Sequence, residues 1–293
     1  MKGIVSKGET ALRTINWILI IFFCFLFLLP FWLVLMSSVT DEMTFVINGY
    51  VLVPKKFSLE GFKFIFGASD LILGSIKNSV IISLTATALT VVIVTMTAYV
   101  LSKKYLPGVK WLSLLFVVTM FFSGGTIPSY LVIRSIGLYD TIWALIIPSI
   151  GNMFYIVLMR SYFYSLPAAL EEAAVIDGAS NMQILLRIFV PLSLPMVATI
   201  GFFTFVDRWN SWMDALIYLG PSSQKLWPVQ YVIKRLLEDM QGLLGSSIGS
   251  LSEAPAQTAK SAGVIITVAP LVVIFPIVHR FFVGGITVGA VKG

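Results

Sequence analysis

One long apolar stretch near the N-terminus decides the class of this protein. Residues 15–36 read INWILIIFFCFLFLLPFWLVLM and contain no charged side chain. An α-helix needs about 20 such residues to cross the hydrocarbon core of a bilayer. The stretch is longer than the apolar part of a secretory signal peptide, and no small-residue cleavage site follows it, so we interpret it as a retained membrane span.

The composition agrees with a membrane protein. Of the 293 residues, 58% are hydrophobic and only 12% are charged, and the mean hydropathy is +0.94. A soluble domain is typically about one quarter charged, because its surface faces water. This chain lacks the polar side chains that such a surface needs.

Five further apolar stretches follow the first. Their apolar residues are continuous rather than alternating, which favours helices over the strands of a β-barrel. Within a bilayer, backbone polar groups must be satisfied inside the spanning element itself. The expected fold is therefore all-α, a polytopic membrane protein with six transmembrane helices. The predicted spans cover residues 15–36, 78–101, 111–133, 141–161, 192–219 and 262–284.

Glycines and prolines interrupt two of these spans. Residues 123–128 read SGGTIP within the third span, and Pro148 and Gly151 lie within the fourth. Such breaks suit a translocation path, where water or neighbouring helices satisfy the freed backbone groups, although they equally suit simple packing kinks. The connections 37–77, 162–191 and 220–261 are long, and the last contains a predicted amphipathic helix from Val229 to Leu244.

The Lys and Arg residues indicate the orientation in the membrane. The short second connection carries Lys103, Lys104 and Lys110, whereas the short third connection carries only Arg134. Because cytoplasmic loops are enriched in Lys and Arg, this asymmetry places the N-terminus in the cytoplasm. Six spans then place the C-terminus there as well. Three segments follow: a cytoplasmic N-terminal segment 1–14, a transmembrane domain 15–284 that includes loop 162–191, and a cytoplasmic tail 285–293.

The charged and metal-binding residues exclude several kinds of chemistry. The net charge is +6 and the pI about 9.4, but the basic residues are scattered through loops, which suits a membrane surface better than nucleic acid. With Cys24 as the only cysteine and His279 as the only histidine, we expect no disulfide within the chain and no metal site. No Gly-x-x-x-x-Gly-Lys-Ser/Thr motif is present, so the chain has no ATP site of its own and no expected catalytic residue.

Residues 166–191, LPAALEEAAVIDGASNMQILLRIFVP, predict two short helices with a sharp turn between them. Pro167 suits the first helical position, where its missing N–H costs nothing. Gly178 can end the first helix in the left-handed conformation. Ser180 and Gln183 have the spacing of a capping box at the start of the second helix.

A two-helix projection on a cytoplasmic loop suits a socket on another protein. The alternative is an amphipathic helix that lies on the lipid surface. Glu171 and Glu172 disfavour that alternative, since anionic lipid surfaces attract Lys and Arg.

The same segment resembles the EAA loop of ABC-importer permeases. The resemblance rests on the spacing of Glu172-Ala173-Ala174, Gly178, Ile188 and Pro191, with Val190 where that pattern commonly has Leu. Residues 136–148, 209–210 and 289–293 extend the resemblance over nearly the whole chain. Together these residues resemble the carbohydrate-uptake, maltose-permease-like branch, which has the type I ABC importer permease fold.

The resemblance implies a complete transport system in the bacterial inner membrane. The chain would be the permease subunit of an ATP-driven importer for a sugar or oligosaccharide. Its partners would be a cytoplasmic ATPase dimer that uses ATP and Mg, a second permease subunit and an extracytoplasmic solute-binding protein. No cofactor would be bound by this chain itself. The tail Gly289–Gly293 would lie near the ATPases, and the residues implied in coupling to them are Glu171, Glu172, Ala173, Ala174, Asp177 and Gly178.

The most polar part of any predicted span is residues 205–214, FVDRWNSWMD. On a continuous helix, Asp207, Asn210 and Asp214 have the spacing of one face. Polar groups at membrane depth commonly face a bundle interior or a water-filled cavity. These residues are therefore candidates for the substrate path.

Two tryptophans lie beside this polar face. Trp209 and Trp212 are three residues apart, and indole rings next to hydrogen-bonding groups commonly hold sugar rings. The alternative is an aromatic belt at the outer membrane interface, with Arg208 extending toward the head groups. We expect Asn210 to matter more for substrate than Arg208.

Two other functions remain open from the residues alone. A membrane-embedded transferase needs clustered catalytic acids or metal ligands near the interface, and none is evident. An ion-coupled secondary transporter would show internal repeats and midplane charges, for which Asp207 is the only candidate. The sugar is not readable, although the chain resembles permeases for oligosaccharides of complex polysaccharides such as alginate and pectin.

Overall fold

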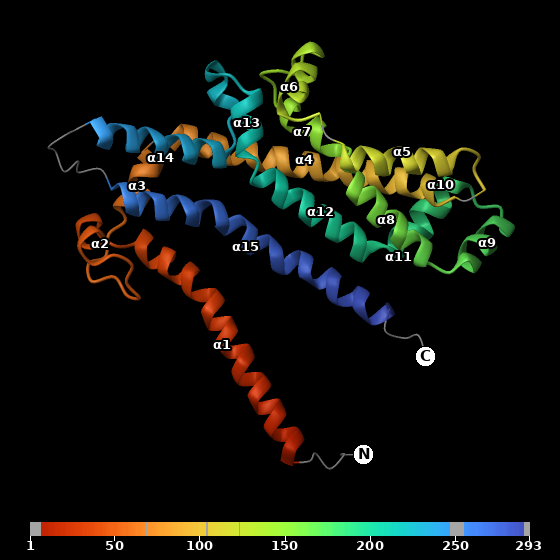
Figure 1. Ribbon diagram of the computed structural model, residues 1–293, viewed down its shortest axis with the longest axis horizontal. Coiled ribbons are helices and arrows are strands. Elements are labelled where there is room, and N and C mark those ends of the chain that lie inside the picture. Colours follow the sequence, from red (N-terminus) through yellow and green to blue (C-terminus); the bar gives the residue numbers. More distant parts are fainter. Residues whose placement is uncertain (1–6, 68, 104, 123, 247–254, 290–293) are drawn as a thin grey trace. The chain divides into compact units, whose positions relative to one another are not determined.

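The computed structural model describes residues 7–67, 69–103, 105–122, 124–246 and 255–289 (Figure 1). In these ranges every regular element is a helix, and the only β pairing is an isolated bridge between Thr40 and Phe57. Three helices are long and apolar enough to cross a membrane alone, and three bent helix pairs bring the number of spans to as many as six. The expected all-α membrane fold is confirmed.

The chain divides into two compact units. The first comprises residues up to Ser69 together with 235–269. Its elements are α1 Lys7–Ser38, α2 Glu42–Asn48 and α3 Glu60–Gly67, with the second part of α14 Val229–Ser246 and the first part of α15 Ala256–Gly289. The amphipathic helix predicted from Val229 to Leu244 is thus confirmed as α14.

The connection after α1 is more ordered than the sequence predicted, since it contains α2 and α3. Asp41 caps α2 by accepting a hydrogen bond from the Thr44 N–H at 3.2 Å. Lys56 lies 2.8 Å from the other oxygen of that carboxylate and lowers the pKa of Asp41. These contacts fold the connection back on itself within the first unit.

Two contacts attach this connection to the start of α15. The carboxylate of Glu42 accepts hydrogen bonds from the N–H groups of Gln257 and Thr258, each at 2.9 Å. An acidic group at this position satisfies donors that the first turn of a helix leaves open. Gly61 packs so closely on Thr258 that a Cβ at Gly61 would lie 2.6 Å from the Thr258 carbonyl carbon.

The second unit comprises residues 70–234 and 270–293. Figure 1 shows α9 and α10 at one end of this unit, with α12 running from that end to α13. Its elements are α4 Ser69–Ser102, α5 Val109–Phe121, α6 Thr126–Ser135, α7 Trp143–Ile150, α8 Met153–Ser165, α9 Ala168–Ile176, α10 Asn181–Ile184, a π-helix η1 Leu185–Phe189, α11 Val190–Leu192, α12 Leu194–Trp209, α13 Trp212–Tyr218 and a 3₁₀-helix η2 Pro221–Leu226.

The core of this unit is built on α4. Val94, Ala98 and Tyr99 of α4 are buried against residues of α5, α8, η1 and α12. α12 packs on α4 at this level, since a Cβ added at Gly201 would be in ordinary van der Waals contact with the Thr87 side chain at 3.6 Å. Several hydroxyl-bearing residues of α4 are buried inside the protein, among them Ser83, Thr90 and Thr95.

The spans bend where the sequence carries helix-breaking residues. α7 and α8 meet at 42° across Gly151 and Asn152, and the helical segment Asn181–Leu192 meets α12 at 80° at Ser193. A proline cannot donate the hydrogen bond of a helix interior, so Pro148 weakens α7 next to its bend, whereas Pro195 lies in the first turn of α12, where no such bond is lost. The single fifth span predicted over 192–219 is wrong: Pro191 lies inside α11, α12 begins at Leu194, and a second break after Trp209 separates α13.

Candidate functional site

The first candidate site is the turn between α9 and α10, where the local predictions are confirmed. Gly178 has φ +78, and the Ala179 N–H donates to the Ala174 carbonyl at 2.9 Å, which closes the end of α9. The Ser180 N–H donates to Oε1 of Gln183 at 2.8 Å, and the Gln183 N–H donates back to the Ser180 hydroxyl at 3.4 Å. Pro167 is the N-cap of α9 rather than its first helical residue, because the helix begins at Ala168.

The structure divides the predicted coupling residues into two groups. Glu172, Ala173, Asp177 and Gly178 are exposed, whereas Glu171 and Ala174 are partly buried against the rest of the unit. Apolar side chains add to the exposed surface, since Val175 is 57% and Ile176 is 85% exposed. The turn therefore presents a mixed acidic and apolar surface outward.

Glu171 makes its ion pair within this chain. Its Oε1 accepts a hydrogen bond from Nζ of Lys103, at the end of α4, at 2.5 Å. The Lys103 side chain is only 5% exposed, and its Nζ lies 4.0 Å from the ring centre of Tyr99. From the sequence, Lys103 indicated only the orientation in the membrane. A lysine directly after an apolar span, four residues beyond a tyrosine, was the signal that could have suggested a buried role.

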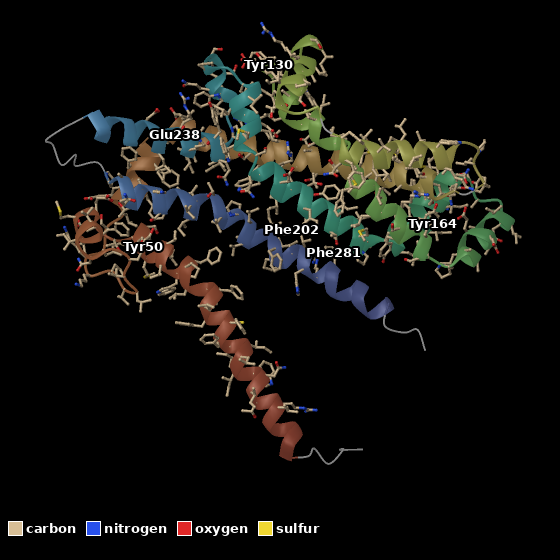
Figure 2. All side chains as sticks on the ribbon, in the orientation of Figure 1. Tyr50, Tyr130, Tyr164, Phe202, Glu238 and Phe281 are labelled. Carbon is tan, nitrogen blue, oxygen red and sulfur yellow. The ribbon has the colours of Figure 1, made fainter. Side chains whose placement is uncertain are left out.

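An open cavity of about 800 Å³ adjoins this ion pair. Figure 2 shows Tyr164, one of its lining residues, at the α9 end of the unit. The Tyr164 hydroxyl accepts a hydrogen bond from Arg160 at 2.9 Å and donates one to the Leu101 carbonyl at 3.3 Å. The cavity thus lies between α9 and the ends of α4 and α8.

The second candidate site lies where α12 ends and α13 begins. Asp207, Asn210 and Asp214 do not share the face of one helix, because α12 ends at Trp209 and α13 starts at Trp212. That prediction assumed a continuous helix and is wrong. Arg208 instead joins the two carboxylates.

The Arg208 guanidinium is the centre of this polar cluster. It donates to Asp207 and to Asp214, each at 2.7 Å, and to the Leu145 carbonyl of α7 at 3.2 Å. The Arg208 side chain is 11% exposed, whereas that of Asp207 is 63% exposed. The cluster therefore connects α7, α12 and α13, and the Asp207 carboxylate remains exposed.

The two tryptophans have different surroundings. Trp209 is only 1% exposed and stacks on Phe205 with ring centres 6.0 Å apart, so it packs inside the unit and does not line the adjoining cavity. Trp212 instead has the Lys234 ammonium 4.4 Å from its ring centre. Asn210 donates to the Val206 carbonyl at 2.9 Å and accepts from Gln230 at 3.0 Å.

A shallow cavity of about 890 Å³ adjoins this cluster. Asp207 and Asn210 supply polar groups, and Tyr155, Phe202 and Phe275 supply aromatic walls. Figure 2 shows Phe202 along α12. Polar groups among aromatic side chains are a common arrangement for binding small polar molecules.

The described residues contain no group of His, Cys, Asp and Glu side chains that could hold a metal ion. His279 is exposed, with its ring centre 5.7 Å from that of Phe275. The last residues of the predicted tail, 290–293, lie outside the part of the chain that the structure describes.

Comparison with known proteins identifies the family. The family described as binding-protein-dependent transport system inner membrane component matches residues 104–288. The polygalacturonan/rhamnogalacturonan transport system permease protein YtcP of Bacillus subtilis (strain 168) is 37% identical over 276 residues, which are 94% of this chain and 96% of that protein. Protein LplC of the same organism is 35% identical over 268 residues, covering 91% of this chain and 90% of LplC.

Solved structures agree with this assignment. A bacterial ABC transporter involved in the import of the acidic polysaccharide alginate contains a chain with a TM-score of 0.79 and 27% identity, covering 94% of this chain and 98% of that one. The expected type I importer permease fold is confirmed by this likeness. The chain belongs to the binding-protein-dependent transport system inner membrane components, which are the permease subunits of ABC importers and are not themselves catalytic.

Proposed function

We propose that this chain is one of two membrane-spanning subunits of an ATP-driven importer for a sugar or oligosaccharide. One relative, YtcP, is named for polygalacturonan and rhamnogalacturonan, and a permease 30% identical over 260 residues is named for trehalose in Mycobacterium tuberculosis (strain CDC 1551 / Oshkosh). The observation that carries the proposal is the exposed turn at Gly178, which presents a surface suited to a partner protein.

The partner at this turn is an ATPase subunit. Glu172, Ala173, Asp177 and Gly178 form the contact, and the exposed Ile176 supplies apolar area that a socket would cover. ATP and Mg belong to the ATPase dimer. Closure of that dimer moves α9, and the movement passes through α10 and α11 to the spans, which alternate between outward and inward access.

The length of α12 separates the two candidate sites across the membrane. Its 16 residues span about 24 Å at 1.5 Å per residue, which is most of the roughly 30 Å hydrocarbon thickness of a bilayer. With the Gly178 turn and both termini in the cytoplasm, the Arg208 cluster lies toward the outer surface. The division into a cytoplasmic segment 1–14, a membrane domain 15–284 and a tail 285–293 fits this topology, although α15 continues to Gly289.

The cavity beside α12 contributes to the substrate path. Asp207 and Asn210 offer hydrogen-bonding groups to sugar hydroxyls, and Tyr155, Phe202 and Phe275 offer aromatic faces for the rings. Asp214 and Trp209 support this wall through Arg208 and Phe205, and Trp212 lies beyond the helix break. An extracytoplasmic binding protein delivers the sugar to this outer end, and the second permease completes the path.

Uptake into proteoliposomes tests the proposal. The chain is co-expressed with the second permease and the ATPase, and the binding protein is added outside with maltotriose as the neutral probe and trigalacturonate as the acidic one. We expect uptake of one probe only when ATP is enclosed. Uptake that persists without ATP and follows a proton gradient would instead support a secondary transporter, with the exposed Asp207 carboxylate as its proton site.

A further inference from the structure

The helix α9 has few contacts with the unit that carries it. No residue of α9 is buried, and Ala174 is its partly buried contribution to the main hydrophobic cluster. A helix of 9 residues is too short to be stable alone in water. The Lys103–Glu171 ion pair is therefore a large part of what holds α9 in place.

Lys103 occupies an unusual position for a lysine. Its ammonium group lies 4.0 Å from the ring centre of Tyr99 and 4.6 Å from that of Phe189, with Glu171 as its carboxylate partner. A buried charge is costly unless it is paired, and aromatic faces attract a desolvated cation. The three contacts together therefore fix the position of the ammonium group.

Phe189 connects this lysine to the other side of the turn. It is the last residue of η1, and single turns of π-helix are frequent at functional sites. Its ring packs edge-on against Tyr99 of α4 at 5.1 Å and Phe163 of α8 at 5.3 Å. Lys103 thus contacts the segment before the turn through Glu171 and the segment after it through Phe189.

We infer that Lys103 is a positioning residue that clamps both sides of the Gly178 turn to the end of α4. This inference rests on the proposed function, since it assumes that the turn receives the movement of the ATPase. With the clamp intact, α9 and η1 move with α4 as one body. Without it, α9 can tilt alone, so ATP would be hydrolysed without an equal movement of the spans.

The variants that test the clamp separate charge from packing. Lys103→Met keeps most of the apolar length of the side chain but removes the charge. Lys103→Arg keeps a cation that can pair with Glu171 and face the two rings, although the guanidinium is larger than the ammonium. Glu171→Gln removes the carboxylate charge and leaves the ammonium between the two rings. Lys110→Met is the matched control, because Lys110 is an exposed lysine at the same end of the unit.

The transport measurement uses the assembled importer in proteoliposomes, with maltotriose and trigalacturonate as probes. For Lys103→Met and Glu171→Gln we expect the number of sugars imported per ATP hydrolysed to fall about tenfold, within the usual range of coupling between sites. We expect the double variant to lose no more than either single one, since both remove the same contact. Lys103→Arg and Lys110→Met should keep the ratio of the unaltered importer.

If uptake is too weak to be measured, a distance measurement tests whether Lys103 holds α9 in place. Spin labels at Val175 on α9 and at Val118 on α5 report how firmly α9 is held, and both positions are exposed. We expect Lys103→Met and Glu171→Gln to broaden the distance distribution, and Lys103→Arg to leave it narrow. The inference is overturned if Lys103→Met and Glu171→Gln both leave the number of sugars imported per ATP unchanged, or if both leave the distance distribution unchanged. It is also overturned if neither variant assembles with its partners, since Lys103 would then serve folding alone. If the unaltered importer shows no ATP-driven uptake of any sugar that its binding protein captures, the proposed function fails instead.

Discussion

The Arg208 guanidinium donates a hydrogen bond to the Asp214 carboxylate at 2.7 Å, across the break that separates α12 from α13. A second carboxylate, that of Asp207, and the carbonyl of Leu145 share the same guanidinium. One side chain therefore fixes the angle at which the polypeptide leaves α12 and returns along α13. Asp207, one of the two carboxylate partners, also lines the adjoining cavity.

Removal of this guanidinium is expected to destabilise the protein. Arg208→Met leaves two carboxylates without their cation, but Asp207 is 63% and Asp214 31% exposed, so water partly replaces the lost partner and we expect a cost of about 1–3 kcal/mol. Thermal unfolding in detergent measures the effect. Lys225→Met, which removes an exposed cation of η2, should change stability by no more than about 0.5 kcal/mol. Equal midpoints for the two variants would show that the cluster has no structural role.

Asn210 is expected to affect transport rather than stability. Asn210→Ala removes a polar group from the cavity wall but leaves all three contacts of Arg208 in place. We expect a raised KM for uptake in proteoliposomes with a nearly unchanged unfolding midpoint. The opposite pattern, with reduced stability and an unaltered KM, would remove Asn210 from the substrate path.

Two glycines of α3 offer a matched test of close packing in the first unit. A Cβ at Gly61 would lie 2.6 Å from backbone atoms of Thr258, whereas a Cβ at Gly67 would have nothing within 4 Å. We expect Gly61→Ala to destabilise by about 1–3 kcal/mol, as overpacking usually does, and Gly67→Ala to be neutral. Hydrogen exchange at the Thr258 amide, which donates to Glu42, reports whether the contact has opened. Similar exchange in both variants would contradict the close approach.

The turn at Gly178 is expected to tolerate asparagine but not valine. Its φ of +78 is strained for any side chain, most of all a β-branched one, although no neighbouring atom would touch an added Cβ. Gly178→Val should therefore insert normally but reorient α9 and lower uptake per ATP. Gly178→Asn should retain most of the uptake per ATP, because asparagine enters the left-handed region more readily than valine does. Full uptake by Gly178→Val, measured in the same vesicles, would argue against the docking role.

Asp140 is expected to make a loop contact sensitive to acid. The Gly220 N–H donates to its Oδ1 at 2.7 Å, and hydrogen bonds from Ser223, Gly220 and Ser222 lower the pKa of Asp140 from its ordinary value of 3.8. A lowered pKa in the folded state means that the contact stabilises fully above pH about 4 and is lost as the pH falls through the lowered pKa.

Hydrogen exchange at the Gly220 amide measures this effect. Its protection should decrease at low pH in the unaltered protein, whereas in Asp140→Asn it should be weaker at neutral pH and independent of acid. Asparagine suits the comparison because it tolerates the φ of +65 found at Asp140. The Ala144 amide, which donates to the Thr141 carbonyl at 3.2 Å, serves as the internal control. If protection of the Gly220 amide still decreases at low pH in Asp140→Asn, a titrating group other than Asp140 is responsible.

Features that depend on near neighbours in the chain follow from the order of the residues. Continuous apolar runs predict spanning helices, because a bilayer leaves the backbone no other partner. The left-handed Gly178 and the Ser180–Gln183 capping box are predictable for the same reason, since each depends on atoms within about one helical turn.

Features that depend on where helices bend and pack could not be predicted in this way. Asp207, Asn210 and Asp214 leave their common face because α12 stops at Trp209, and the resulting cluster needs Leu145 from a distant helix. Lys103 and Glu171 are 68 positions apart and meet only because α4, α8 and η1 pack around them. Local hydrogen bonding is thus determined by the sequence itself, whereas burial of a charge and choice of its partner are decided by the packing of the whole unit.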